Sequence, residues 1–302
     1  MTGAAGFIGS HLCERLLRIG FEVHGLDNLS RGSAEKIEAL RRNGLHFHRV
    51  DVRDRYEVER ILREVKPDIV MHLAALISVE ESFEKPELYM EVNAVGTKNI
   101  VEGANKAGSR RLIYASSAAV YGNPIKLPIS EDHPLKPISP YGLSKLAGEV
   151  HIRSRFTGEE NSVILRIFNV YGPGQSLEYA GVIAKFLNHL RMKKPPTIFG
   201  DGSQTRDFIH VHDVVEAFIR SLDAKLDNHE VINIASGKPT RIIDLAETMI
   251  NLFGLDLKPV HQPLRQGDIQ ESYADISRAR RILGWNPSIT LKEGLRSLIE
   301  SS

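Results

Sequence analysis

A tyrosine and a lysine stand four residues apart in the segment Ser139-Pro140-Tyr141-Gly142-Leu143-Ser144-Lys145. Serine is a favourable N-cap and proline suits the first helical position, so this segment predicts the start of a helix. Tyr141 and Lys145 would then share one helix face, where a lysine ammonium favours the phenolate and lowers the phenol pKa from about 10. The pairing predicts Tyr141 as a general base, although an ordinary exposed pair has the same spacing.

Two serines, Ser116 and Ser117, follow the apolar stretch 112–115, which is typical of a buried strand. A hydroxyl at the carboxyl end of that strand could hydrogen-bond the same substrate oxygen as Tyr141. Serines at strand ends are common, so this prediction depends on their combination with the Tyr141 helix.

A glycine turn, Gly3-Ala4-Ala5-Gly6-Phe7-Ile8-Gly9, leads directly into a predicted helix. Glycines let the backbone approach a pyrophosphate, whose charge then lies at the helix N-terminus; alone, this spacing is weak evidence. Asp27 ends the next predicted strand, about 20 residues further on. An acid there accepts hydrogen bonds from ribose hydroxyls and repels a 2′-phosphate, which favours NAD, while Arg31 nearby leaves NADP open.

The strand expected before this turn is represented by two residues, Met1 and Thr2. In a dinucleotide-binding sheet that strand is normally central and has several apolar residues. We favour the interpretation that the start of the chain is assigned a few residues too late. If the strand is truly absent, we expect weaker cofactor binding.

Short apolar strands alternate with amphipathic helices along the first half of the chain. The predicted strands are 22–26, 44–50, 69–73 and 111–115, and the predicted helices are 11–19, 56–65 and 92–106. This alternation predicts an α/β fold with a Rossmann-type doubly wound parallel sheet.

The alternation loosens from about Asn169, although 231–234 is typical of a further strand and 242–253 of a helix. We therefore expect a smaller, interleaved C-terminal substrate lobe. The expected division places the NAD-binding domain at 1–168 with 208–236 threaded back into it, and the substrate lobe at 169–207 and 237–302.

The charges are balanced, with 39 Lys and Arg residues against 38 Asp and Glu residues among 302. This balance removes the electrostatic case for a nucleic-acid or membrane-surface partner. Cys13 is the single cysteine, so neither an intramolecular disulfide nor a cysteine-based metal site can form. No stretch approaches the ~20 apolar residues that cross a bilayer, and no signal peptide is recognisable, so we expect a cytoplasmic protein.

The 12 histidines show no HExxH or similar ligand spacing. His210 and His212 are expected on one side of a strand. We expect no metal.

The sequence resembles the extended short-chain dehydrogenase/reductase family, and within it the UDP-glucose 4-epimerase group, over nearly the whole chain. The matching segments are the glycine turn with Thr2, Leu26-Asp27-Asn28, Asp51-Val52, His72-Leu73-Ala74-Ala75, Asn93, Ser116 to Gly122, Tyr141 with Lys145, Phe168-Asn169, Phe199 to Gly202, Arg206-Asp207-Phe208 and Arg265 to Asp268. These ordered matches are specific for the family and less specific for one reaction.

The resemblance implies NAD as cofactor and a UDP-sugar as substrate. It places Asp27 and Asn28 at the adenosine ribose and Asp51 and Val52 at adenine, with further cofactor contacts from Gly3, Gly6, Phe7, Ile8, Gly9, Leu73, Ala74, Ala75, Asn93, Ser116, Tyr141, Lys145 and Phe168. It places the substrate against Ser117, Tyr141, Asn169, Phe199, Arg206, Arg265, Asp268 and Ser272. Two arginines suit a diphosphate because each offers planar, charge-assisted donors.

The implied reaction is a 4-epimerisation through a transient 4-keto sugar. Tyr141 removes the proton from the 4-hydroxyl, the C4 hydride passes to a permanently bound NAD, and the hydride returns after the keto sugar has rotated. Ser117 hydrogen-bonds the 4-oxygen throughout. Relatives of this type often pair through a four-helix contact, which implies a homodimer.

Alternative functions remain on the same fold. Related dehydratases and decarboxylases carry an acidic residue just after the strand-end serine or threonine, where this chain has Ala118 and Ala119. A UDP-glucuronate 4-epimerase or another enzyme acting on nucleotide sugars stays open, as does a non-catalytic NAD-binding protein. Ser272 stands where epimerases restricted to small sugars tend to have tyrosine, so we expect UDP-GlcNAc and UDP-GalNAc to be accepted as well.

Overall fold

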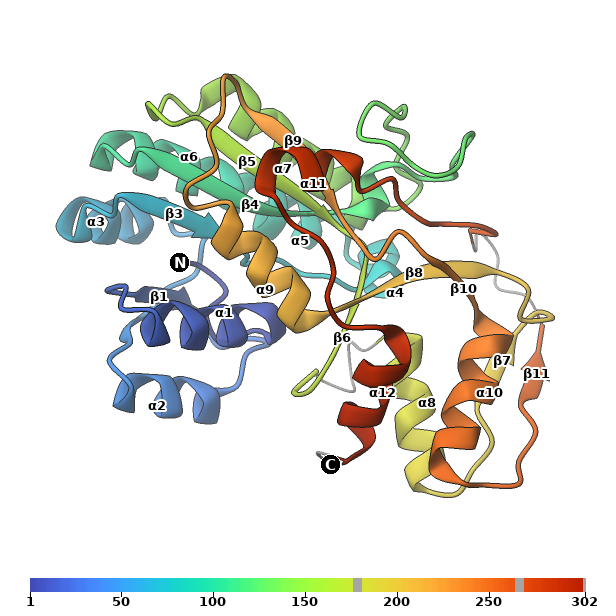
Figure 1. Cartoon of the computed structure of the whole chain (residues 1–302). Helices are drawn as coiled ribbons and strands as arrows, with labels where there is room; N and C mark the ends of the chain where they lie inside the picture. The colour runs from blue at the N-terminus through green and yellow to red at the C-terminus, as the bar shows by residue number, and fades with distance from the viewer. Residues whose placement is uncertain (176–180, 264–268, 301–302) are drawn as a thin grey trace.

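The computed structural model describes residues 1–175, 181–263 and 269–300. Its larger part is a parallel sheet with helices on both faces (Figure 1). The elements of this part are α1 (Phe7–Arg18), β1 (His24–Asp27), α2 (Ala34–Arg42), β2 (His46–Arg49), α3 (Arg55–Val65), β3 (Ile69–His72), α4 (Val79–Glu84), α5 (Pro86–Tyr89), the π-helix η1 (Met90–Val95), α6 (Gly96–Ala107), β4 (Arg111–Ser117), the 3₁₀-helix η2 (Ala118–Val120), α7 (Pro140–Arg155), β5 (Ser162–Ile167), α9 (Val211–Arg220), β9 (Glu230–Ile234) and α11 (Ser277–Leu283).

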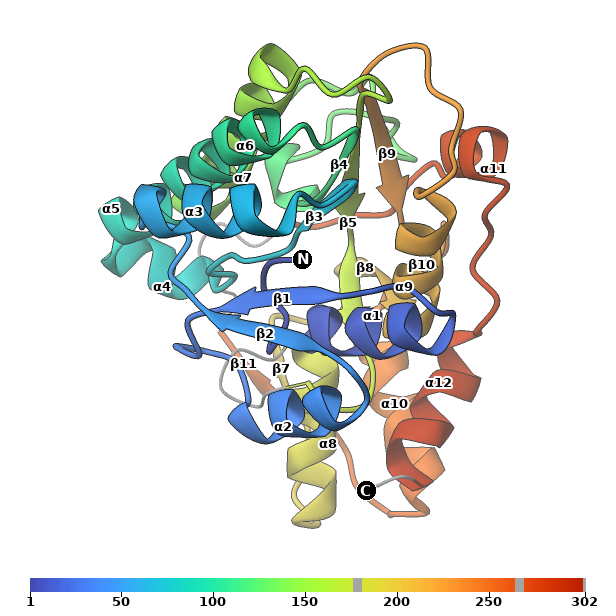
Figure 2. The ribbon, with the colours of Figure 1, turned by 90° about the vertical axis from the view of Figure 1, so that its left-hand side faces the viewer.

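The sheet consists of two sets of parallel strands joined through Thr2. β1 pairs with β2, while β3, β4, β5 and β9 pair in that order. Thr2 forms isolated parallel bridges to Leu26 of β1 and His72 of β3, and the Met1 amine donates a hydrogen bond to His24 O at 2.6 Å. Figure 2 shows β1 and β2 side by side, with the N-terminus between them and β3.

Both faces of the central strands β4 and β5 are buried, which explains why these strands are mostly apolar. Along β4, Ile113 and Ala115 belong to one core, and Leu112 and Tyr114 belong to the other. Helices α1, α2, α9 and α11 cover the first face, and α3, α6 and α7 cover the second. Each fully buried large apolar side chain stabilises the fold by about 1.5–3 kcal/mol.

The remaining elements form a smaller lobe beside this sheet (Figure 1). They are β6 (Asn169–Tyr171), α8 (Val182–Arg191), β7 (Thr197–Phe199), β8 (Thr205–His210), β10 (Pro239–Arg241), α10 (Ile242–Phe253), β11 (Val260–Gln262) and α12 (Leu291–Glu300). β8 lies between β10 and β6, and β7 pairs with β11. Helices α8, α10 and α12 enclose a separate core.

The α/β class and the Rossmann-type parallel sheet are therefore as the sequence predicted. β9 returns the chain to the first sheet by pairing with β5. Ala279, Leu283 and Trp285, which were assigned to the substrate lobe, pack in the core of the first sheet. The exact division into domains remains a proposal.

One local prediction is wrong. His210 and His212 do not share a strand face, because β8 ends at His210 and α9 begins at Val211. The His210 imidazole caps this helix by accepting a hydrogen bond from His212 N at 3.3 Å. A side-chain cap satisfies one of the unpaired N–H groups at a helix start, which stabilises the change from strand to helix.

Candidate active site

The glycine turn brings the backbone close to the loop after β3. Gly3 has a φ of 71°, and a Cβ added to it would lie 2.8 Å from Ala74 N. A Cβ on Gly9 would collide with the carbonyl oxygen of Gly3. The N-cap of α1 is Gly6, which has no side chain to satisfy the first N–H groups of the helix. The turn therefore leaves backbone donors and the positive end of the helix dipole for an anion, and it fits the diphosphate of a dinucleotide.

Two carboxylates lie at the carboxyl ends of β1 and β2, beside this turn. Asp27 accepts hydrogen bonds from Ala5 N at 3.0 Å and Leu29 N at 2.8 Å. Burial raises the pKa of Asp27, and these two donors oppose that rise. Asp27 therefore braces the glycine turn directly.

Asp51 follows β2 and is the second carboxylate. It accepts hydrogen bonds from the Arg53 guanidinium at 2.8 and 3.0 Å and from Asn28 Nδ2 at 2.9 Å. The bonds from Arg53 lower the pKa of Asp51 to about 2. Asn28 and Asp51 are thus held together as a polar pair next to Asp27.

Tyr141 lies in the first turn of α7. The helix begins as predicted, since Ser139 accepts a hydrogen bond from Gly142 N at 3.1 Å and Pro140 occupies the first helical position. Burial raises the pKa of the Tyr141 phenol, and a hydrogen bond donated by Ser117, at the carboxyl end of β4, partly opposes that rise. The pKa of Tyr141 is therefore raised, whereas the Tyr141–Lys145 spacing predicted a lowered pKa.

Lys145 is buried behind Tyr141, with 2% of its surface exposed. Its ammonium lies over the ring of Tyr114, 4.2 Å from the ring centre. Burial lowers the pKa of Lys145 to about 7, and the nearby Glu149 carboxylate opposes the shift. Lys145 is therefore a group whose charge can change close to neutral pH.

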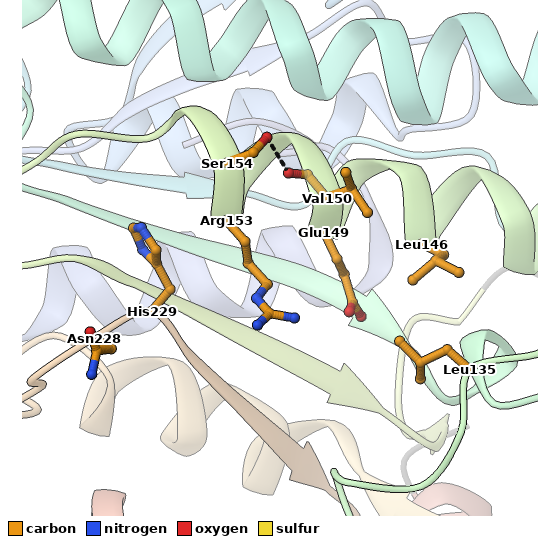
Figure 3. A pocket seen from close by; sticks show the side chains of 8 residues that line it. All are labelled: Leu135, Leu146, Glu149, Val150, Arg153, Ser154, Asn228 and His229. Carbon is orange, nitrogen blue, oxygen red and sulfur yellow. Dashed lines mark hydrogen bonds between the residues drawn. The ribbon is translucent and has the colours of Figure 1, made fainter.

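Glu149 continues the helix face that carries Tyr141 and Lys145, and no function was predicted for it. Figure 3 shows its side chain projecting from α7 toward the sheet. Its carboxylate accepts hydrogen bonds from Ser116 Oγ at 2.5 Å and from the Arg166 guanidinium at 2.7 and 3.0 Å. This ion pair is buried on both sides, so it links α7 rigidly to β4 and β5.

The hollow in Figure 3, of about 520 Å³, lies beside α7, between this helix and the segments that precede α7 and β9. Among the described residues, its lining consists of Leu135, Leu146, Glu149, Val150, Arg153, Ser154, Asn228 and His229. This lining comes from α7 and the approaches to α7 and β9 rather than from the glycine turn. We place the active site at the carboxyl ends of the strands instead.

The smaller lobe meets this region through β6 and β8. Asn169 Nδ2 donates to Asp207 O at 3.0 Å, and Arg206 Nη1 donates to Ile269 O at 2.6 Å. The buried Asp207 carboxylate accepts hydrogen bonds from Gly237 N at 3.0 Å and Ala274 N at 3.2 Å. Asp207 therefore holds together three segments that are distant in the sequence.

Known proteins share this architecture over the whole chain. The family profile described as GDP-mannose 4,6 dehydratase matches residues 1–298. The chain belongs to the extended short-chain dehydrogenase/reductase family. A UDP-glucose 4-epimerase of Mycolicibacterium smegmatis is 40% identical over 304 residues, covering 99% of this chain and 96% of the relative.

Solved structures in the family agree with this relationship. The UDP-glucose 4-epimerase of Thermotoga maritima with UDP-glucose has a TM-score of 0.92 at 36% identity. The Thermus thermophilus UDP-glucose 4-epimerase complex with NAD has a TM-score of 0.88 at 35% identity. Each comparison covers 99% of this chain and 96% of the relative's chain. The family and the epimerase-like class predicted from the sequence are confirmed.

Two of the family's predicted cofactor residues have their side chains engaged inside the protein. Ser116 Oγ donates to the Glu149 carboxylate of α7, as described above. Asn93 Nδ2 donates to Leu76 O and Ser144 Oγ, both at 2.9 Å, and Asn93 Oδ1 accepts from Leu76 N at 2.8 Å. Asn93 therefore holds the loop after β3 against α7, and a cofactor contact from either side chain remains a prediction.

The other predicted residues fall into three groups. Phe7 and Ile8 open α1, Val52 follows β2, Leu73, Ala74 and Ala75 follow β3, and Phe168 lies buried between β5 and β6. Phe199 ends β7, and Ser272 is buried in a segment next to β8. Arg265 and Asp268 lie outside the described residues. The roles of all these residues remain predictions.

The sequence alone did not identify the supports beneath Tyr141. Glu149 had one available signal, since Tyr141, Lys145 and Glu149 repeat every four residues along a helix. Arg166 had no such signal in the sequence. Nothing in an apolar strand indicates which distant residue its arginine will contact in the folded protein. Cys13 is fully buried. Within the described residues, no helix is long and apolar enough to span a membrane.

Proposed function

We propose that this protein is an NAD-dependent UDP-sugar 4-epimerase that interconverts UDP-glucose and UDP-galactose. The observation that carries the proposal is the contact between Tyr141 and Ser117 at the carboxyl end of β4. A phenol and a hydroxyl in contact with each other could both hydrogen-bond one sugar oxygen, which supports the proposed reaction. The family relationship and the glycine turn support the cofactor, which neighbouring structures bind.

The chain's own residues would supply the proton transfer. Tyr141 Oη takes the proton from the sugar 4-hydroxyl, and later returns a proton to the 4-oxygen. Ser117 Oγ donates a hydrogen bond to that oxygen as its charge develops. Bound NAD would supply the acceptor and donor of the C4 hydride, so the cycle would have no net oxidation.

Lys145 provides the charge that makes this proton transfer favourable. A protonated Lys145 ammonium on the same helix face would favour the phenolate, against the effect of burial on Tyr141. Glu149 raises the pKa of Lys145, so it favours the protonated ammonium. The Arg166–Glu149 pair thus acts through Lys145, as a positioning element rather than as a proton donor.

The epimerase proposal is favoured over a dehydratase by the residues after Ser117. A dehydratase needs a second acid/base group, and Ala118 and Ala119 form the 3₁₀ turn there. Neither methyl group can exchange a proton. A UDP-glucuronate 4-epimerase would use the same atoms, so the substrate experiment below includes that sugar.

We propose that Asn169, Phe199, Arg206, Arg265, Asp268 and Ser272 hold the substrate. The buried Ser272 supports a pocket that also accepts N-acetylated sugars, because its side chain is much smaller than tyrosine. In this arrangement the UDP part is held tightly and the sugar is contacted weakly. The keto sugar could therefore rotate in the pocket between the two hydride transfers.

The test is incubation of the purified protein with UDP-galactose and no added NAD, followed by NMR of the sugar anomeric protons. Conversion to UDP-glucose would support both 4-epimerisation and tightly bound NAD. Failure with UDP-galactose, UDP-GlcNAc and UDP-glucuronate, each repeated with NAD added, would contradict the proposal. Activity that needs stoichiometric fresh NAD would contradict the permanently bound cofactor.

We also propose a homodimer formed through η1, α6 and α7. The exposed fractions of Val95, Leu143 and Val150 are 46%, 52% and 57%, although all three are apolar. Light scattering should give twice the chain mass, and Leu143→Asp with Val150→Asp should give monomers. A wild-type mass of one chain would refute the dimer.

The proposed compartment is the cytosol, and the proposed pathway is galactose metabolism.

A further inference from the structure

Three histidines gather at the amino ends of β1 and β2, away from the active site. His24 begins β1 and is the register partner of His46, which begins β2. His48 follows two residues later, so it projects from the same face of the sheet. The rings of His24 and His46 are stacked with their centres 4.7 Å apart.

Glu22 completes a set of potential metal ligands. One ligand atom from each of Glu22, His24 and His46 lies within 4.8 Å of the other two. Glu22 Oε1 is 3.0 Å from His24 Nε2. Zinc bonds of about 2.0–2.2 Å with tetrahedral angles hold ligand atoms roughly 3.4 Å apart, so small side-chain rotations would bring these three atoms together.

The cluster is open enough for an ion and its remaining water ligand. The Glu22 side chain is 75% exposed and the His24 side chain 22% exposed. His46 is also exposed. The Glu22 and His46 side chains can therefore rotate without disturbing the core, and an ion can reach the cluster from solvent.

His48 supplies the support that a metal-binding imidazole usually has. Its Nε2 lies 3.0 Å from His24 Nδ1, which leaves His24 Nε2 to face Glu22. Bonding through the second ring nitrogen fixes the orientation and tautomer of a ligand histidine. Arg60 also lowers the pKa of His48, but the Arg60 guanidinium forms ion pairs with Glu57 and Glu64.

We propose that Glu22, His24 and His46 bind one divalent transition-metal ion such as Zn²⁺, with water as a further ligand. Two imidazoles and one carboxylate are a donor set that suits zinc. The histidine spacing in the sequence did not predict this site, because the pairing of β1 with β2 creates it. The site is separate from the proposed active site, since Asp27 and Asp51 lie at or beyond the opposite ends of these strands.

Binding would clamp the β1–β2 pair. This pair joins the remaining sheet through Thr2, and its carboxyl ends carry the polar groups beside the glycine turn. A ligand that binds the native state and not the unfolded state stabilises the fold, so the ion should raise the melting temperature.

The test uses the tag-free full chain, stripped of metal with a chelator and titrated with Zn²⁺ by calorimetry. We expect one equivalent to bind and the melting temperature to rise. His46→Ala and Glu22→Gln should each weaken binding at least tenfold, whereas the exposed His261→Ala should leave it unchanged. These substitutions are at the surface, so folding should be retained.

Two results would overturn the proposal. One is the absence of stoichiometric Zn²⁺ binding to the wild-type chain. The other is binding by His46→Ala that equals the wild type. The inference is independent of the proposed epimerase activity, because its readouts are heat and melting temperature.

Discussion

Replacing Lys145 with methionine isolates the effect of burying one ammonium beside the active-site tyrosine. Lys145 is almost fully buried, and burial lowers its pKa from 10.5 to about 7. Methionine has a similar length and no charge, so Lys145→Met removes the titration while keeping most of the packing. Glu149 keeps its ion pair with Arg166 in the variant.

The pKa of Lys145 sets the sign of the expected pH effect. Between pH 7 and 10.5 the unfolded chain keeps its proton while the folded chain loses it, so the free energy of unfolding rises with pH. One pKa unit corresponds to about 1.4 kcal/mol, and a group with these two values contributes about 2 kcal/mol between pH 7 and 9. Lys145→Met should lack this increase.

Urea unfolding of both proteins at pH 7 and pH 9 measures the difference. Burial lowers the pKa of the Met1 amine and raises that of Cys13 to about 12, but these titrations are common to both proteins and cancel. Lys98→Met is the matched control, because the Lys98 side chain on α6 is 41% exposed and the variant should keep the wild-type pH dependence. An equal rise in the wild type and Lys145→Met would refute the reasoning.

Three further substitutions test the proposed site. Tyr141→Phe should lower kcat about 10²- to 10⁴-fold with little change in melting temperature, since general acid–base catalysis contributes that much; a wild-type rate would exclude Tyr141 as the base. Gly9→Ala should release NAD, because a Cβ at this position collides with Gly3 O. The control is Gly181→Ala, which has open space around the added Cβ and should retain NAD. The measurement is the NAD content of each purified protein. Ser272→Tyr should lower turnover of UDP-GlcNAc relative to UDP-glucose by at least tenfold, and an unchanged ratio would disprove its role in specificity.

The local elements of this fold were predictable because each has its own signal in the chain. The α10 helix has the predicted bounds, and β9 and α3 begin one residue early. Apolar runs of strand length followed by amphipathic helices leave a parallel sheet as the arrangement that buries both faces. The helix start at Ser139 and Pro140 was predictable for the same reason, since its cap uses neighbouring residues.

The irregular helical stretch at 90–95 was not predictable in this way. The predicted helix at 92–106 is a π-helix followed by α6, starting two residues earlier than expected. Asn93 lies in this π-helix, where it bonds Leu76 and Ser144. A distortion that is fixed by distant partners leaves no periodic pattern in the local sequence.

The electrostatics of the site depended most on tertiary structure. The sequence placed Tyr141 and Lys145 on one helix face and identified Ser117 as their neighbour. It could not show that burial would raise the pKa of Tyr141 and lower that of Lys145, because desolvation depends on the elements packed around them.

The sequence by itself determined the fold class, the family and the chemical types available at the site, since these follow from local patterns and ordered motifs. Tertiary structure alone decided which distant residues meet. Arg166 finds Glu149 because β5 lies beside β4 under α7, and His46 finds His24 because β2 pairs with β1. Such contacts depend on strand order and register, which are set by the packing of the whole sheet rather than by any one segment.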